Sequence, residues 1–161
     1  MQLRSINSAD WHEILLIQEE CYPQIEPESL EVLRSKWLVS PQTCFVIELD
    51  KQVVGYCLAH PWVVGSPPSL EQTLVAVTNP DTLYLHDIAL SSKVQGKGAG
   101  KRAFNALVEL ARELGLPCIS LVAVQGADSF WRRQGFIAHP IEKSLESYTP
   151  DACYMELDLS A

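Results

Sequence analysis

The sequence predicts one α/β domain, built on a mixed, largely antiparallel sheet with helices on both faces. Its 161 residues suit a single domain of ordinary size, and 47% of them are hydrophobic. Apolar, β-rich stretches alternate with segments whose apolar residues recur at helical spacing. A strand–helix–strand unit in the middle of the chain indicates that the sheet is mixed. We therefore expect one domain over residues 1–161.

The N-terminal part is expected to form a short strand and two helices. QLRSI reads as the strand, and Asn7 or Ser8 can then cap the first helix. The apolar residues of that helix follow helical spacing: Trp11, Ile14 and Leu15. A second helix fits residues 28–38, with glutamates near its start, where the helix dipole favours negative charge.

The next segments predict a hairpin and a long connection. TCFVIEL and QVVGYCLAH are rich in β-forming residues, and Asp50-Lys51 between them reads as a tight turn. Residues 61–82 hold four of the ten prolines. We expect them to form a long connection, with room for a short helix or strand in its middle.

The remaining segments alternate between strands and helices. TLYLHDIAL is almost continuously apolar, which predicts a strand covered on both faces. Residues 98–114 form an amphipathic helix that Gly115 and Pro117 terminate. The rest completes the pattern: a buried strand at CISLVAV, a short helix at ADSFWRRQ, and two last strands at FIAHP and CYMELDL.

Composition argues against several classes of protein. The net charge of −8 disfavours nucleic acid as a partner, because phosphate binding depends on basic surface. No apolar run approaches the ~20 residues of a membrane helix, and the N-terminal stretch MQLRSINSADWHE is not a signal peptide. The five cysteines form no CxxC pair and the four histidines show no metal-binding spacing. We expect no metal site, no membrane partner, and a reducing, cytoplasmic location.

A glycine-rich turn inside a basic segment is the strongest chemical signal. Residues 91–133 carry a net charge of +4 in this acidic chain. Within them, Gln95-Gly-Lys-Gly98-Ala-Gly100 lies between a buried strand and an amphipathic helix. Glycines let the backbone approach a ligand, and the free amides of a helix N-terminus favour phosphate. The structural alternative is that the glycines only allow a tight turn.

Two common nucleotide-binding patterns fail at this turn. A Walker A loop needs glycine at position 95 and Ser or Thr at position 102, where Gln95 and Arg102 stand. The dinucleotide fingerprint beginning at Gly96 needs a glycine where Lys101 stands. A general nucleotide-binding function is therefore improbable.

The turn resembles the acetyl-CoA loop of the GNAT superfamily of N-acetyltransferases, Gln/Arg-x-x-Gly-x-Gly/Ala. The resemblance includes LYLHDIALSSKVQGKGAGKRAF and continues at Ala127-x-x-Phe-Trp-x-x-x-Gly-Phe136. It implies a three-layer α/β/α fold whose sheet is splayed at the acetyl-CoA site. It also implies transfer of an acetyl group from acetyl-CoA to a small-molecule or peptide amine, by direct attack in a ternary complex, and leaves a homodimer open.

The same resemblance implies which residues bind acetyl-CoA. The strand before the loop would hydrogen-bond the pantetheine arm, and the loop amides would cradle the pyrophosphate beside lysines that neutralise it. Residues on the short later helix would touch the far side of the cofactor, although packing within the helix explains them as well. The implied cofactor-binding residues are Ile88, Ala89, Leu90, Gln95, Gly96, Lys97, Gly98, Ala99, Gly100, Lys101, Ser129, Phe130 and Arg132.

Catalysis is assigned from the residues of the buried strand. His86 and Asp87 are its only imidazole and carboxylate, and buried ionisable groups need a partner or a function. A histidine can accept the proton of the amine near neutral pH. The alternative is a structural histidine, with Asp87 paired to a backbone amide. Alternation predicts Tyr84 on the face of His86 and Asp87 on the opposite face.

The acid that protonates the leaving thiolate is not fixed by the sequence. The tyrosine that usually does so in the GNAT superfamily is replaced by Trp131, whose indole is not an acid. Tyr84, Tyr148, Tyr154 and solvent remain candidates. The same replacement keeps a second function open, a catalytically weak module that senses acyl-CoA or regulates a partner.

Overall fold

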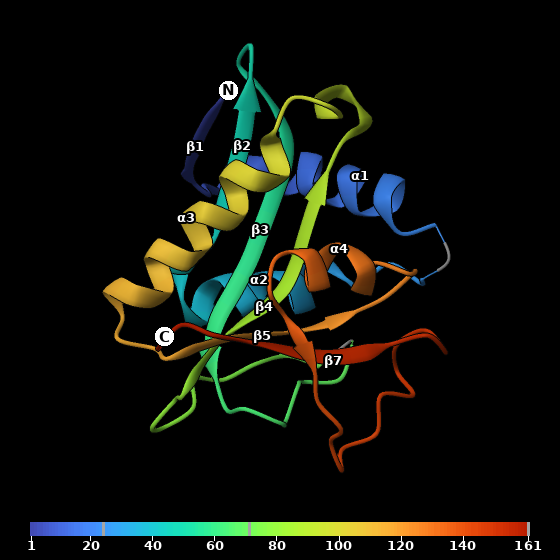
Figure 1. Ribbon diagram of the computed structural model, residues 1–161. Coiled ribbons are helices and arrows are strands. Elements are labelled where there is room, and N and C mark those ends of the chain that lie inside the picture. The colour runs from blue at the N-terminus through green and yellow to red at the C-terminus, as the bar shows by residue number, and fades with distance from the viewer. Residues whose placement is uncertain (24, 71, 161) are drawn as a thin grey trace.

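A single mixed sheet organises the computed structural model, which describes residues 1–23, 25–70 and 72–160 (Figure 1). In this part of the chain seven strands lie in the order β1-β2-β3-β4-β5-β7-β6. The strands are β1 (Gln2–Ser5), β2 (Phe45–Leu49), β3 (Gln52–Trp62), β4 (Thr82–Leu90), β5 (Cys118–Ala123), β6 (Ile137–Ala138) and β7 (Cys153–Asp158). The helices are α1 (Trp11–Cys21), α2 (Leu30–Val39), α3 (Ala99–Glu113) and α4 (Asp128–Arg133), with 3-10 turns η1 (Ser8–Asp10), η2 (Pro41–Thr43) and η3 (Ser92–Val94).

The strand directions confirm the predicted mixed sheet. Among the described strands, every neighbouring pair is antiparallel except β4 and β5, which are parallel. Parallel pairing here follows from the crossover through α3, which returns the chain to the edge where β4 began. The pairing therefore changes from antiparallel to parallel at β4.

Helices cover both faces of the sheet, so the molecule has three layers (Figure 1). On one face the apolar sides of α1 and α2 pack on β2 and β3, around residues such as Ile14 and Leu33. On the other face α3 and α4 pack on the sheet, around Leu107 and Trp131. This is the three-layer α/β/α arrangement that the sequence predicted.

Caps set where the first helices begin. Asn7 caps η1, and its backbone amide in turn donates to the Asp10 carboxylate, so the chain is already turning before α1 starts. The predicted helix over residues 28–38 begins at Leu30, because the Ser29 hydroxyl accepts from the Val32 amide as its N-cap. The long connection after β3 holds neither helix nor strand in its described residues.

The hairpin turn has the expected chemistry. Asp50 and Lys51 join β2 to β3, and both have positive φ angles, 51° and 65°. Such a two-residue turn matches the right-handed twist of the strands that it connects. The turn therefore sets the register of the strand that pairs with β4.

A β-bulge at His86 overturns the predicted alternation along β4. Leu58 of β3 pairs with Asp87, but the next residue, Ala59, pairs with Leu85, so His86 is an extra residue in β4. Because of the bulge, the side chains of His86 and Asp87 lie on the same face of the sheet, the one covered by α1 and α2. There His86 hydrogen-bonds Glu28, and Asp87 accepts a hydrogen bond from Tyr22. The expectation that Asp87 faces away from His86 is therefore wrong. Strict alternation holds only for a strand without a bulge.

Strands β4 and β5 diverge beyond a short paired segment. Their parallel register runs from Leu83 opposite Ile119 to Leu85 opposite Leu121 and then stops. Past that point the edge of β4 has no strand beside it, which opens a gap where residues 86–90 face residues 122–124. The splay expected from the sequence resemblance is present, and it lies next to His86.

Candidate functional site

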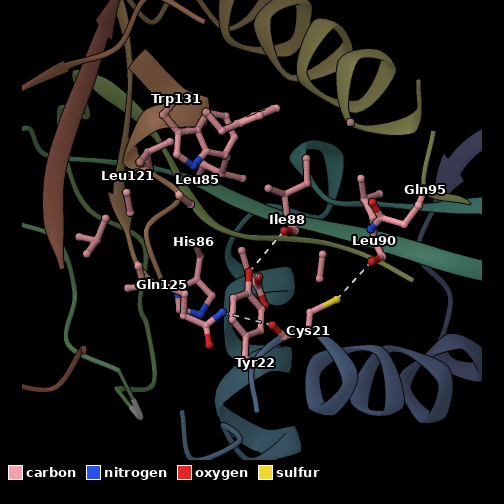
Figure 2. Close-up of a pocket in the computed structure, with 18 residues that line it drawn as sticks. Cys21, Tyr22, Leu85, His86, Ile88, Leu90, Gln95, Leu121, Gln125 and Trp131 are labelled. Carbon is pink, nitrogen blue, oxygen red and sulfur yellow. Dashed lines mark hydrogen bonds between the residues drawn. The ribbon is translucent and has the colours of Figure 1, made fainter. Parts of the chain in front are cut away.

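A cavity of about 320 Å³ fills the gap between the diverging strands. Residues 85–90 form one wall, residues 121–125 form the other, and Trp131 and Phe130 close the side of α4. Figure 2 shows Tyr22 and Cys21 at the end of α1 directed at the β4 wall. The cavity therefore follows the open edge of β4 toward the glycine-rich turn.

The end of α1 already contacts carbonyl groups on this open edge. The Cys21 thiol donates to the Leu90 carbonyl at 3.3 Å, and the Tyr22 hydroxyl lies 3.3 Å from the Ile88 carbonyl (Figure 2). The Gln125 side-chain amide donates to the Cys21 carbonyl at 3.2 Å across the cavity. Burial raises the pKa of the Cys21 thiol to about 11, so the thiol is a hydrogen-bond donor here and not a nucleophile.

The glycine-rich turn lies at one end of the cavity, and its backbone adopts a conformation that favours glycine. Gly96 and Gly98 have φ angles of 76° and 74°, and Gly98 is the N-cap of α3. At each of them, no described atom lies within 4 Å of the position that a Cβ would take, so the outer side of the turn is open. The amides of the first turn of α3 have no intrahelical acceptor and point out of its N-terminus. The turn can therefore take a negatively charged group.

Six of the thirteen predicted cofactor-binding residues line this cavity and seven do not. The six are Ile88, Ala89, Leu90, Gln95, Gly100 and Phe130. Lys97 and Lys101 are exposed on the turn and the start of α3, whereas the Ala99 side chain is buried in the core. On α4, Arg132 pairs with Asp128 at 3.4 Å and the Ser129 hydroxyl faces the Gly126 carbonyl, so neither side chain points into the cavity.

His86 lies in the wall at the bulge, with one ring nitrogen partnered. Its Nε2 is 2.6 Å from Oε1 of Glu28, and the two side chains are 2% and 6% exposed. The Nδ1 atom is buried and has no hydrogen-bond partner among the described residues. Because an ionised carboxylate only accepts hydrogen bonds, this contact assigns the imidazole proton to Nε2. Nδ1 then keeps its lone pair.

Glu28 belongs to a buried polar group that comes from α1 and α2. Its Oε2 lies 3.3 Å from Nζ of Lys36, which is fully buried and also donates to the Gln72 carbonyl. The side-chain amide of Gln18 makes two hydrogen bonds with the Glu28 backbone. Both anchors fix the carboxylate that reaches His86.

Asp87 is held by two phenols. Its Oδ1 accepts from the Tyr22 hydroxyl at 2.5 Å, and its Oδ2 accepts from the Tyr56 hydroxyl. Burial raises the pKa of Asp87, against the opposite effect of these hydrogen bonds, and raises the pKa values of both tyrosines well above 10. The carboxyl group is thus fully occupied within the fold.

The candidate tyrosines differ in their access to the site. Tyr84 is buried, lines neither cavity, and donates to Tyr148, whose own hydroxyl donates to the Pro68 carbonyl at 2.6 Å. Tyr154 donates to Glu156 and accepts from the Gly65 amide, away from β4. Trp131 lines the cavity, with its ring packed among Phe104, Phe130 and Phe136.

A second, smaller cavity of about 70 Å³ adjoins the first. Five residues line both cavities: Tyr22, His86, Asp87, Val122 and Val124. The rest of the second wall combines apolar and acidic residues with two polar ones: Ile25, Pro27, Leu70, Glu26, Glu28, Gln18 and Tyr148. His86 and Asp87 therefore lie in the wall that the two cavities share.

Four residues of the site were not predicted from the sequence: Glu28, Lys36, Tyr22 and Tyr56. One signal was available for Lys36, which falls three residues after Leu33 on the apolar face of a predicted helix and so needs a buried anion. The others come together only through long-range packing of the loop before α2 against β4.

The described residues contain neither a metal-ligand cluster nor a membrane-spanning helix. No group of three or more His, Cys, Asp or Glu residues is placed to hold a metal ion. In the same part of the chain, no helix is long and apolar enough to cross a membrane.

Comparison with known proteins gives one sequence family. Residues 11–136 match the family described as the acetyltransferase (GNAT) family. A curated relative, "Probable hydrolase YhcX" of Bacillus subtilis (strain 168), is 26% identical over an alignment of 132 residues, and the match covers 74% of this chain and 25% of the relative. The chain thus spans about a quarter of the length of that relative.

Solved structures share the fold over nearly the whole chain. The GNAT-like decarboxylase GphF in complex with isobutyryl-CoA has a TM-score of 0.81 at 13% identity, covering 99% of this chain and 100% of that one. Ard1 from Thermoplasma volcanium has a TM-score of 0.76 at 14% identity, covering 99% and 98%. N-acetylglutamate synthase from Neisseria gonorrhoeae, complexed with coenzyme A and N-acetyl-glutamate, has a TM-score of 0.75 at 15% identity, covering 99% and 35%. With a splayed mixed sheet, a glycine turn before α3, and a family match over most of its length, the chain belongs to the acetyltransferase (GNAT) family.

Proposed function

We propose that this protein transfers the acetyl group of acetyl-CoA to a primary amine, by direct attack within a ternary complex. The observation that carries the proposal is the position of His86, whose unpartnered Nδ1 is buried in the wall that two adjoining cavities share. Acetyl-CoA bound in one cavity and the amine bound in the other would meet at this residue.

The first cavity fits acetyl-CoA. Its open β4 edge supplies backbone groups of residues 88–90 for an extended pantetheine arm, and the turn around Gly96 and Gly98 has room for a pyrophosphate. Lys97 and Lys101 are exposed beside the turn and can neutralise phosphate charge. Relatives of the same fold are in complex with isobutyryl-CoA or coenzyme A, which supports this choice. Acetyl-CoA would supply the acetyl group as a thioester.

The second cavity suits a small cationic amine. Glu26, Glu28 and Asp87 are acidic, and no Lys or Arg is among the described residues of its wall. The apolar residues Ile25, Leu70 and Val122 can cover the hydrocarbon part of a substrate. The expected acceptor is therefore an ammonium next to an apolar group, on a small molecule or at one end of a peptide.

His86 would remove the proton that stops an ammonium from attacking. His86 lines both cavities, its Nδ1 has no hydrogen-bond partner among the described residues, and Glu28 would stabilise the imidazolium that forms. Asp87 is less suited to this role because both of its oxygens already accept hydrogen bonds from tyrosines. Its part is to hold Tyr22 at the wall and to pair with the buried Tyr56 hydroxyl.

Protonation of the departing thiolate falls to solvent or to Tyr148, whose hydroxyl would first have to release the Pro68 carbonyl. Of the three tyrosines that the sequence offered, Tyr148 lines a cavity, whereas Tyr84 and Tyr154 line neither. The mouth of the first cavity is open, so water can also reach the sulfur.

Five free cysteines in the structure suit a cytoplasmic location.

The competing function is a weakly catalytic sensor of acyl-CoA. It is favoured by Trp131, which lines the first cavity at the position where the GNAT superfamily usually has the tyrosine that protonates the thiolate. Thiol release from acetyl-CoA, measured with a panel of small amines, separates the two. Turnover with cationic, partly apolar amines supports the enzyme. Thermal stabilisation by acetyl-CoA without turnover supports the sensor. No stabilisation at millimolar acetyl-CoA would contradict both.

A further inference from the structure

We propose that Glu28 is a positioning residue that fixes the tautomer of His86, with the proton on Nε2 and the lone pair on Nδ1. The benefit for acetyl transfer rests on the proposed function. The tautomer itself does not, because it follows from contacts within the folded chain.

The contact between the two side chains is short and shielded from water. Nε2 and Oε1 are 2.6 Å apart, and both side chains are almost fully buried. A neutral imidazole has one N–H and one lone pair, and a carboxylate can meet only the N–H. A lone pair at Nε2 would face a negative oxygen at this distance, with no water to separate them.

The carboxylate is itself held from two directions. Lys36 donates to Oε2 at 3.3 Å from α2, so the group carries a counter-ion on the side away from His86. Gln18 of α1 clamps the Glu28 backbone, donating to the carbonyl at 3.3 Å and accepting from the amide at 3.1 Å. A carboxylate fixed in this way can orient a ring, as the acidic partner of a catalytic histidine does in other enzymes.

The other charged or titratable groups near His86 do not compete for its nitrogens. Asp87 comes from the same strand, but Tyr22 and Tyr56 occupy its oxygens. His60 comes from β3, and burial lowers its pKa to about 3, which keeps it neutral. Lys36 stands behind Glu28. Among the described residues, Glu28 is the hydrogen-bond partner of the His86 ring.

Replacing Glu28 by Gln inverts the hydrogen-bonding pattern while its shape is kept. Lys36 can only donate, so the new amide must turn its carbonyl oxygen to Nζ and its NH₂ group to His86. A donor facing Nε2 moves the ring proton to Nδ1. The lone pair that was proposed to take the substrate proton is then lost from Nδ1.

The test is ¹⁵N NMR of histidine-labelled protein at about pH 8.5, where an ordinary imidazole is neutral. The His86 signals are assigned by their loss in His86→Asn. In the wild type we expect the proton on Nε2, and in Glu28→Gln on Nδ1. The matched control is Glu26→Gln, which removes an exposed carboxylate two residues away in the same cavity wall and leaves the proton on Nε2.

Either of two results would overturn the proposal. One is a wild-type His86 with its proton on Nδ1, which needs no variant to be folded. The other is a folded Glu28→Gln protein with the proton still on Nε2. If the tautomer inverts as expected but the wild type releases no thiol with any amine, the positioning role stands and the proposed function fails. If the positioning role and the proposed acetyl transfer are both correct, Glu28→Gln lowers kcat about 10²–10⁴-fold and leaves the KM for acetyl-CoA unchanged.

Discussion

Gln18 and Glu28 form a two-hydrogen-bond clamp that ties the loop before α2 to the buried side of α1. The Gln18 amide donates to the Glu28 carbonyl at 3.3 Å and accepts from the Glu28 amide at 3.1 Å, and both residues are about 5% exposed. Such a pairing satisfies two buried backbone groups that have no strand or helix to pair with. The loop that carries the Glu28 carboxylate is thus held by a residue of α1 that itself lines the second cavity.

Gln18→Leu should therefore destabilise the protein and loosen this loop. Leucine has a similar volume but leaves the Glu28 amide and carbonyl unsatisfied, which costs about 1–3 kcal/mol in the free energy of unfolding. Urea denaturation measures the loss, and amide exchange at Glu28 reports the local opening. Glu19→Leu, at the exposed neighbouring position of α1, serves as the control and should change stability by less than about 0.5 kcal/mol.

Acid should weaken the protein partly through Asp10. Its hydrogen bonds from Arg4, with a further one from the Asn7 amide, hold the pKa of the Asp10 carboxyl below its ordinary value of 3.8. A carboxyl with a lowered folded-state pKa stabilises the fold above its unfolded pKa, and this contribution is lost as pH falls through the folded value. Stability should therefore drop below about pH 4.

The variant Asp10→Asn isolates this contribution. It should lose about 1–3 kcal/mol at neutral pH, because the charge-assisted hydrogen bonds with Arg4 are removed. Its stability should then fall less between pH 5 and pH 2, a range chosen to bracket the ordinary pKa of Asp, than that of the wild type. Parallel pH curves for the two proteins would show that Asp10 is not the group responsible.

Gly98→Val should impair acetyl-CoA binding more than folding. The φ angle of 74° is strained for a β-branched residue, which costs about 1–2 kcal/mol, but the added Cβ meets no described atom within 4 Å outside the adjacent residues. Valine would instead occupy the open side of the turn, where we place the pyrophosphate.

The chain offers a matched control for this variant. Gly115, just beyond the other end of α3, has a φ angle of 70° and equally open surroundings. Gly115→Val should lose similar stability and keep its thermal shift with acetyl-CoA, whereas Gly98→Val should lose that shift. Equal shifts in the two variants would remove the glycine turn from the binding site.

The sequence predicted the fold well because its signals are local. Asn7, the Asp50-Lys51 turn, the glycines around Gly98 and the apolar run of β4 each specify their own element. The relative arrangement of layers then followed from the resemblance at the glycine turn. Small errors, such as a second helix beginning at Leu30, reflect a capping serine that was counted inside the helix.

The site was harder to predict because it depends on register and on long-range pairing. Strict alternation predicted that Asp87 and His86 point to opposite faces of the sheet. The register shift between Leu58 and Ala59, which overturns this, cannot be predicted from the residues of β4 alone. Glu28 lies 58 positions from His86, and no motif links them. The donor cavity could be anticipated from a motif, whereas the buried partners of the proposed base could not.

Replacement of His86 and of Asp87 should separate chemistry from stability. His86→Ala removes the Nδ1 lone pair, so kcat/KM should fall about 10²–10⁴-fold, as for loss of a general base. The acidic limb of the pH–rate profile should disappear with the imidazole, while acetyl-CoA still stabilises the protein. Asp87→Asn instead leaves Tyr22 and Tyr56 facing an amide that cannot accept both phenol protons at once as the carboxylate does. Its melting temperature should fall, with kcat/KM of the folded protein within a few-fold of the wild type. Should Asp87→Asn abolish turnover and the acidic limb while His86→Ala keeps both, the proton would leave the amine through Asp87 and the two phenols that now surround it.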